Sequence, residues 1–184
     1  EGQVNMFVWM CILAGFILAF PYILFQIWGF ISPALYVNEK KNAKFFIFVS
    51  SLLFFLGVLF GYFVIVPMSV NFVATFTVSE MVKNQFTLES YIGMFKTSVL
   101  AGGLFFELPI IIYFLTKLGL VTPEFLRKYR KYAIVIVLIV AAIVTPPDVV
   151  SQTIVAIPML IIFELSVIIS SIVYKQKLKN EQLS

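Results

Sequence analysis

The sequence has no histidine, one cysteine and few charged residues. Only 12% of its 184 residues are charged, and Asp148 is its single aspartate. Common zinc sites need several His or Cys ligands, so these counts exclude them, and Cys11 alone excludes an internal disulfide framework. A nucleophile with its base, or a catalytic metal cluster, is equally unsupported. We therefore expect no enzyme activity, no metal and no cofactor.

Apolar residues make up most of what is present. The sequence is 61% hydrophobic and 17% aromatic, with a mean hydropathy of +1.05. A soluble domain is roughly 45–50% apolar, and one with this composition would leave large apolar patches in water. Lipid must be the solvent for most of the chain. This predicts an all-α fold, a polytopic membrane helix bundle.

Five apolar stretches predict five transmembrane helices within a single domain, residues 1–184. They cover about residues 6–30, 45–66, 91–117, 132–145 and 150–174. A helix needs roughly 20 residues to cross the hydrocarbon core. Pro21 should kink the first stretch and Pro158 should break the last. Gly57 and Gly61 form a Gly-xxx-Gly pair, which lets another helix approach closely.

Basic residues lie in short runs between the apolar stretches. Eleven of the thirteen follow the first, third and fifth stretches, and only Lys83 and Lys96 lie on the alternate side. The positive-inside rule therefore predicts that these three basic segments are cytoplasmic. Nucleic-acid binding needs one concentrated basic face, so it is not expected. The amino end would then lie outside the cytoplasm with no visible signal peptide, so we expect a preceding sixth helix and an intact protein with both termini cytoplasmic.

The most basic segment is 119–131. Thr122 is typical of a helix N-cap, with Pro123 at the first helical position. A short surface helix through Arg130 would carry basic side chains towards the phosphate groups of membrane lipids. These side chains are Arg127, Lys128, Arg130 and Lys131.

Two acids, Glu107 and Glu164, interrupt the apolar stretches. An ionised acid near the bilayer centre costs about 2.5–3.5 kcal/mol, and such residues usually face a bundle interior and serve a function. The alternative is a structural hydrogen bond. With Gln26, at the inner end of the first stretch, they could form an intramembrane polar groove. Asp148 follows two prolines in an outer loop and is most simply a turn former.

The first inner loop combines aromatic residues, Phe30 among them, with the carboxylate of Glu39. A carboxylate is a natural bidentate partner of an arginine guanidinium. The alternative is an aromatic belt beside a solvated charge, and spacing alone favours that alternative.

Four stretches, taken together, carry a family resemblance. They are QIWGFISPALYVNEKK from Gln26, FELPIIIYFLTKLG from Phe106, TPEFLRKYRKY from Thr122 and TPPDVVSQT from Thr145. Their order and spacing resemble the TatC family, the multi-span subunit of the twin-arginine protein translocase. The resemblance implies six helices in a concave wall, of which this sequence supplies the last five. Related sequences often have an arginine directly after the residue that matches Glu39, whereas this sequence has Lys40 and Lys41 there.

The resemblance also implies a function. Members of the family recognise twin-arginine signal peptides of folded precursor proteins and help to transport these proteins across the cytoplasmic (inner) membrane of a bacterium, using the proton motive force. The implied partners are single-span subunits of the TatA/TatB type and other TatC copies. The match places Glu39 as the partner of the signal arginines and Phe30 as its aromatic neighbour. Glu107 matches the intramembrane acid of the concave face, and Asp148 matches the acid of the outer loop. Gln26 lies at the matching inner end of the first helix of this sequence.

The fourth stretch, 132–145, has 14 residues and rises only about 21 Å, against a core about 30 Å thick. We hypothesise that it thins the adjacent bilayer and eases the passage of cargo. Transport that survives lengthening this helix by one turn would contradict the hypothesis. The main rival function, a small-solute transporter, predicts repeated halves, and no internal repeat is visible.

Overall fold

The computed structural model of the protein describes residues 2–31, 43–75 and 87–182. In these residues every regular element is a helix, which confirms the all-α prediction. The chain runs through α1 (Gly2–Ile31), α3 (Ala43–Phe60), the π-helix η2 (Gly61–Ile65) and α4 (Val66–Thr75). It continues through α5 (Leu88–Phe106), α6 (Leu108–Lys117), α7 (Pro123–Lys128), α8 (Arg130–Val144) and α9 (Val149–Gln182).

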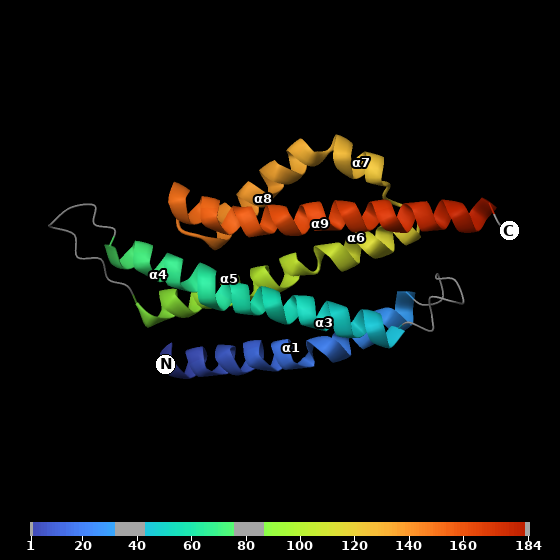
Figure 1. The fold of residues 1–184 in the computed structure, drawn as a ribbon. Coiled ribbons are helices and arrows are strands. Elements are labelled where there is room, and N and C mark those ends of the chain that lie inside the picture. The colour runs from blue at the N-terminus through green and yellow to red at the C-terminus, as the bar shows by residue number, and fades with distance from the viewer. Residues whose placement is uncertain (1, 32–42, 76–86, 183–184) are drawn as a thin grey trace.

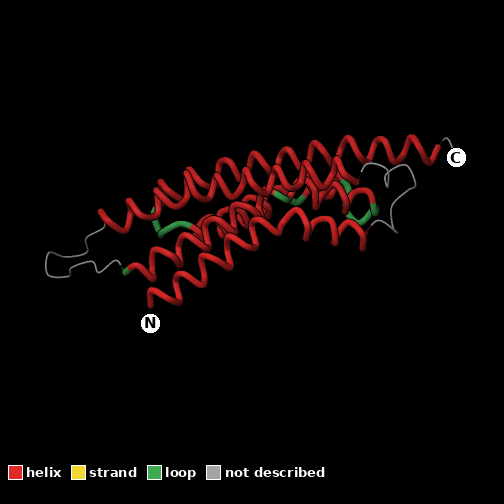
Figure 2. The backbone as a smooth tube through the Cα atoms, turned by 90° about the horizontal axis from the view of Figure 1, so that it is seen from below, coloured by secondary structure: helices red, strands yellow, loops and turns green. Residues whose placement is uncertain are grey.

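The long helices lie side by side in a row (Figure 1). α1 packs on α3, α3 and η2 pack on α5, and α6 packs on α9, while α7 and α8 fold back along α9. The row is bowed when it is seen from below (Figure 2). The last residues of α1, α6 and α9 and the first residues of α3 share one end of the bundle (Figure 1). We call this the basic end, because it carries Lys44, Lys117, Lys175, Lys177 and Lys179.

Four helical stretches are long and apolar enough to cross a membrane. They are Gln3–Phe30, Lys44–Thr75, Leu88–Lys117 and Val149–Lys179, found by length and composition among the described residues. α8, the predicted fourth crossing, has 15 residues and is not one of them. A helix of this length rises only about 22 Å, so its crossing of the membrane stays a prediction.

Two prolines lie within helices that remain continuous. α1 passes through Pro21, and α9 passes through Pro158 and continues to Gln182. The predicted break at Pro158 was therefore wrong, and the helix itself continues beyond Tyr174, where the predicted membrane crossing ends. One missing backbone donor does not end a helix that is packed on α6 and α8. Beyond Tyr174 the residues are mainly Lys, Gln, Leu and Glu, which favour helix.

A third proline coincides with a change of helix type. The second predicted helix continues past Val66 to Thr75 through the π-helix at Gly61–Ile65. There the N–H of Val66 donates to the carbonyl of Gly61, five residues earlier. Pro67 has no N–H and would crowd the carbonyl four residues before it. The wider π turn just before Pro67 lets the chain continue in one direction.

Small residues bring α3 and η2 against α5. A Cβ atom added at Gly57 would lie 2.3 Å from the carbonyl oxygen of Gly102, and one at Gly61 would lie 2.5 Å from that of Ser98. Only glycine allows backbones to come so close. The ring of Phe54 lies fully buried beside Gly103 and stacks on Phe20 of α1, with ring centroids 3.5 Å apart. The Gly-xxx-Gly pair therefore sets a helix contact, as its spacing predicts.

A second apolar core joins η2, α8 and α9. It is centred on Ala141 and Met159, which have no exposed surface. The other buried members are Ile65, Val137, Val144, Val155 and Ala156. α8 ends where the N–H and hydroxyl of Thr145 both bond to the carbonyl of Ala141, and Pro146 and Pro147 follow. This turn places Asp148 at the start of α9.

Candidate functional site

The site is centred on Glu107, which occupies the one-residue break between α5 and α6. Its backbone lies at φ −77° and ψ −11°, and its carbonyl accepts the N–H groups of Ile110 and Ile111 at 3.0 Å each. Pro109 has no N–H, so the regular ladder cannot run through this position. The break sets the acid ten residues before Lys117, or about 15 Å from the basic end.

The Glu107 side chain is buried between helices, with 6% of its surface exposed. The Ser50 hydroxyl of α3 donates a hydrogen bond to its Oε2 atom. Its Oε1 atom is also buried and has no hydrogen-bond partner among the described residues. An unpaired buried polar atom costs about 1–3 kcal/mol. An acid kept in such a place is expected to be there for function rather than for stability.

The surroundings of Ser50 are apolar and aromatic. A cavity of about 30 Å³ lies beside it, with room for one water molecule. Trp28 of α1 stacks on Phe46 of α3 at 5.4 Å between ring centroids and meets Phe114 of α6 edge-on at 5.6 Å. Three helices thus converge on the Ser50–Glu107 pair. The remaining cavity residues are Leu24, Ile27, Ile47 and Ile110.

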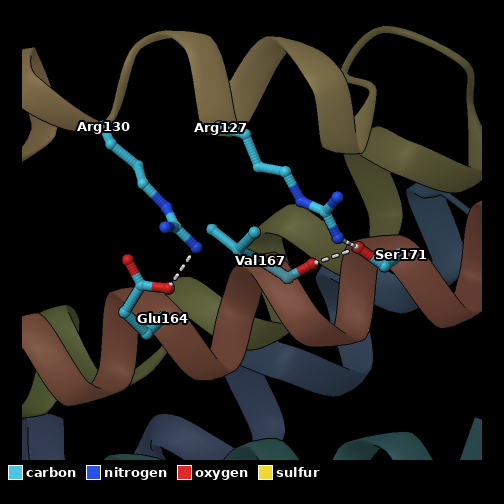
Figure 3. Close-up of polar contacts among 5 residues, drawn as sticks. All are labelled: Arg127, Arg130, Glu164, Val167 and Ser171. Carbon is cyan, nitrogen blue, oxygen red and sulfur yellow. Dashed lines mark hydrogen bonds and ion pairs between the residues drawn. The ribbon is translucent and has the colours of Figure 1, made fainter.

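Glu164 belongs to a different site. Its Oε2 atom pairs with Nη2 of Arg130 at 2.7 Å, and both side chains are nearly half exposed (Figure 3). Nη2 of Arg127 donates to the hydroxyl of Ser171, which lies two helical turns after Glu164 on α9, at 3.2 Å (Figure 3). These contacts tie α7 and the start of α8 to α9. The third predicted groove residue, Gln26, donates to the hydroxyl of Tyr22 on its own helix at 2.7 Å.

The three predicted groove residues therefore bond to three unrelated partners. Glu107 bonds to α3, Glu164 to α8 and Gln26 to α1. Hydrogen bonds do not join them to one another, and only Glu107 is buried.

The predicted loop site is described in part. Phe30 lies in the last turn of α1 with 88% of its side chain exposed, at the basic end. It does not join the cluster around Trp28, which is buried. Glu39, the predicted partner of the signal arginines, lies outside the described residues.

Asp148 caps α9. Its Oδ2 atom accepts the N–H and the hydroxyl of Ser151, each at 2.8 Å. The backbone hydrogen bond, followed by the hydroxyl, lowers the pKa of this carboxyl below its usual value, because both stabilise the ionised form. An acid at a helix N-terminus is also favoured by the helix dipole. These contacts fit the turn-forming role that its position after two prolines predicts.

Sequence reasoning missed the partners of the acids. The signal available for the partner of Glu107 was that Ser50 and Ser51 are the only serines in the predicted 45–66 helix. Arg127 and Arg130 are three residues apart, which places them on one face of a helical segment. A buried bond between the hydroxyls of Thr116 and Ser170, at 2.8 Å, also joins α6 to α9.

No group of three or more His, Cys, Asp or Glu side chains lies together in the described part of the chain.

Comparison with known proteins identifies the family. The family model of the Sec-independent protein translocase protein (TatC) matches residues 2–158. The chain belongs to the TatC family. A TatC from Blattabacterium sp. subsp. Periplaneta americana (strain BPLAN) is 46% identical over 96% of the chain, and one from Helicobacter pylori (strain J99 / ATCC 700824) is 42% identical over 91%. TatCy of Bacillus subtilis (strain 168) is 38% identical over 95% of the chain.

The chain spans about two thirds of the length of these TatC relatives: 66%, 67% and 68%. The fold is also that of solved TatC structures. A crystal structure of the twin-arginine translocase receptor TatC superposes with a TM-score of 0.75 at 37% identity, covering 92% of this chain and 75% of that one. Family, apolar helices and fold together make this chain a membrane protein of the TatC family.

Proposed function

We propose that this chain forms the membrane-embedded receptor of a twin-arginine translocase. In that role it recognises twin-arginine signal peptides and helps to transport folded proteins across the cytoplasmic membrane, driven by the proton motive force. The observation that carries the proposal is the likeness, over 92% of the chain, to a structure named as the twin-arginine translocase receptor. Its partners would be single-span TatA/TatB-type subunits and further TatC copies, and it would act as a transport component rather than an enzyme.

The charge distribution supports a cytoplasmic position for the basic end. Lys117, the last residue of α6, and the lysines near the end of α9 lie there, whereas Lys96 lies in the first half of α5, whose first residues are at the opposite end (Figure 1). Lysine and arginine are enriched in cytoplasmic segments of membrane proteins. The end of α1 and the start of α3, which share this end of the bundle, would then lie at the cytoplasmic surface (Figure 1).

Recognition of the signal peptide would combine an ion pair with the burial of apolar surface. Glu39 would pair with the signal arginines, beside the exposed ring of Phe30. A solvent-exposed pair contributes only about 0.2–1 kcal/mol, whereas micromolar binding needs about 8 kcal/mol. The apolar stretch of the signal must therefore supply most of the affinity, at about 25 cal/mol for each Å² removed from water. The charge pair would supply the preference for arginine.

The test compares two signal peptides on the purified protein of full native length in detergent. One peptide carries Arg-Arg and the other Lys-Lys, and each is labelled for fluorescence anisotropy. We expect tighter binding of Arg-Arg to the unaltered protein, because arginine matches a carboxylate with two hydrogen bonds and lysine does not. Glu39→Gln should remove this preference and leave the apolar contribution.

Glu124→Gln is the matched control, since Glu124 is an exposed acid of α7 and loses the same charge. The preference should survive in this variant. Equal binding of both peptides to the unaltered protein would refute the receptor role. A preference that persists in Glu39→Gln would refute only the assignment of Glu39.

A further inference from the structure

The segment formed by α7 and the first turn of α8 has two chemically different faces. One face is tied to α9 by Arg127 and Arg130, which bond to Ser171 at 3.2 Å and to Glu164 at 2.7 Å (Figure 3). Both guanidinium groups point at α9 (Figure 3). These two arginines therefore hold the segment in place, and the prediction that all four basic residues face lipid phosphates is wrong for them.

The other face carries three aromatic rings in a row, each tilted against the next. The ring centroids of Phe125 and Tyr129 lie 4.5 Å apart, and those of Tyr129 and Tyr132 lie 5.7 Å apart. All three side chains are exposed, at 51%, 40% and 54%. Their spacing of four and three residues places them on one side of the segment. Aromatic side chains at the end of a membrane helix are typical of the boundary between acyl chains and headgroups.

Two lysines border these rings. The ammonium of Lys128 lies 5.9 Å from the ring centroid of Tyr129, and that of Lys131 lies 5.2 Å from that of Tyr132. Both lysines are exposed. The nearest acid along the chain, Glu124, lies one turn before Lys128, and within the described residues it forms no ion pair with it. Their positive charge is thus available to an outside partner.

We propose that this aromatic-basic face, formed by Phe125, Lys128, Tyr129, Lys131 and Tyr132, binds the headgroup of an anionic phospholipid. The rings would occupy the depth of the glycerol and upper acyl chains. The lysine stems would run over them and carry the ammonium groups to the phosphate. A free phosphate ion would leave the rings without a partner, so the occupant is a lipid. The arginine contacts with α9 keep the face in shape before the lipid arrives.

The size of the effect follows from the two charges. One lysine near an anionic leaflet strengthens binding about fivefold, so two together contribute roughly 25-fold. The proposal is independent of signal-peptide recognition, because it uses neither Phe30 nor Glu39.

Native mass spectrometry of the detergent-purified protein, titrated with phosphatidylglycerol and separately with phosphatidylcholine, tests it. The first phosphatidylglycerol should bind more tightly than the first phosphatidylcholine. The double variant Lys128→Gln, Lys131→Gln should weaken phosphatidylglycerol binding by roughly 10- to 25-fold and leave phosphatidylcholine unchanged. Lys128→Arg with Lys131→Arg should restore the binding, because the charge returns.

The matched control is Lys175→Gln with Lys179→Gln, which removes the same charge from exposed positions on α9. It should bind phosphatidylglycerol like the unaltered protein. An equal loss in both double variants would overturn the proposal, because net charge alone would then explain the binding. Displacement of the lipid by inorganic phosphate at constant ionic strength would also overturn it, since the site would then bind soluble anions.

A third variant tests the rings. Tyr129→Leu with Tyr132→Leu keeps both lysines, so phosphatidylglycerol should bind more weakly while its preference over phosphatidylcholine persists. Unchanged affinity would show that the rings do not contribute to lipid binding.

Discussion

Replacing Gly102 by alanine perturbs the contact between α3 and α5 at its closest point. The new Cβ atom would lie 2.4 Å from the carbonyl oxygen of Gly57 and 3.2 Å from the backbone nitrogen of Gly61. Ordinary contact begins near 3.4 Å, so the helices must separate by about 1 Å. Both neighbours are backbone atoms and cannot rotate away. Overpacking of this kind costs about 1–3 kcal/mol.

Alanine also favours helix over glycine by up to about 1 kcal/mol, which offsets part of this cost. We therefore expect Gly102→Ala to lower the free energy of unfolding by about 1–2 kcal/mol. The assay is unfolding in mixed micelles by increasing SDS, followed by tryptophan fluorescence. Trp28 reports on the bundle because it is buried against Phe46.

Gly15 and Gly93 provide the controls, because a Cβ atom at either would meet no atom within 4 Å. Alanine there should leave stability unchanged or slightly raised. The double variant Gly57→Ala, Gly102→Ala should cost less than the sum of the single changes, since both Cβ atoms separate the same two helices. If Gly102→Ala proved as stable as Gly15→Ala, the close-contact argument would be wrong.

Two further predictions concern polar side chains. Ser50→Ala removes the donor to Glu107, so the same SDS assay should show a free energy of unfolding lower by about 1–3 kcal/mol. Ser50→Thr keeps a hydroxyl and should lose less stability. Equal stability of the unaltered protein and both variants would show that the hydrogen bond contributes nothing. Asp148 has a folded pKa below its ordinary value of 3.8, so its ionised form stabilises the fold above that pH and this contribution is lost as the pH falls through the folded pKa. The stability advantage of the unaltered protein over Asp148→Asn should therefore be constant near neutral pH and shrink below about pH 4, as followed by thermal unfolding in detergent; an advantage that does not change with pH would refute this.

Several features of the fold could be predicted because they depend on short-range pattern. The apolar stretches predict the helices, because in lipid every backbone polar group must be satisfied within the segment. Gly57 and Gly61 predict a close helix contact, and the structure has it against Ser98 and Gly102. The turn role of Asp148 follows from the two prolines before it, and its contacts with Ser151 agree.

Other features of the fold and of the site could not be predicted from short-range sequence pattern. The end of α9 depends on good helix formers after Tyr174, which a hydropathy reading treats as a polar tail. The prediction of a polar groove placed Gln26, Glu107 and Glu164 together from their depth along the helices. Depth alone does not give their hydrogen-bond partners, because these also depend on how each helix is rotated about its axis. α1 and α9 are apolar on nearly every side, so no amphipathic stripe indicates which face turns inward.

The sequence by itself determined the class of protein, the helical segments, the basic end and the family resemblance. Each of these follows from composition, charge and residues that are neighbours along the chain. Only the tertiary structure decided that Glu107 meets Ser50, 57 residues away, and that Glu164 meets Arg130, 34 residues away. It also decided that Arg127 and Arg130 face α9 while Lys128 and Lys131 remain exposed. Such pairings arise when whole helices pack, because packing fixes the rotation that local sequence leaves free.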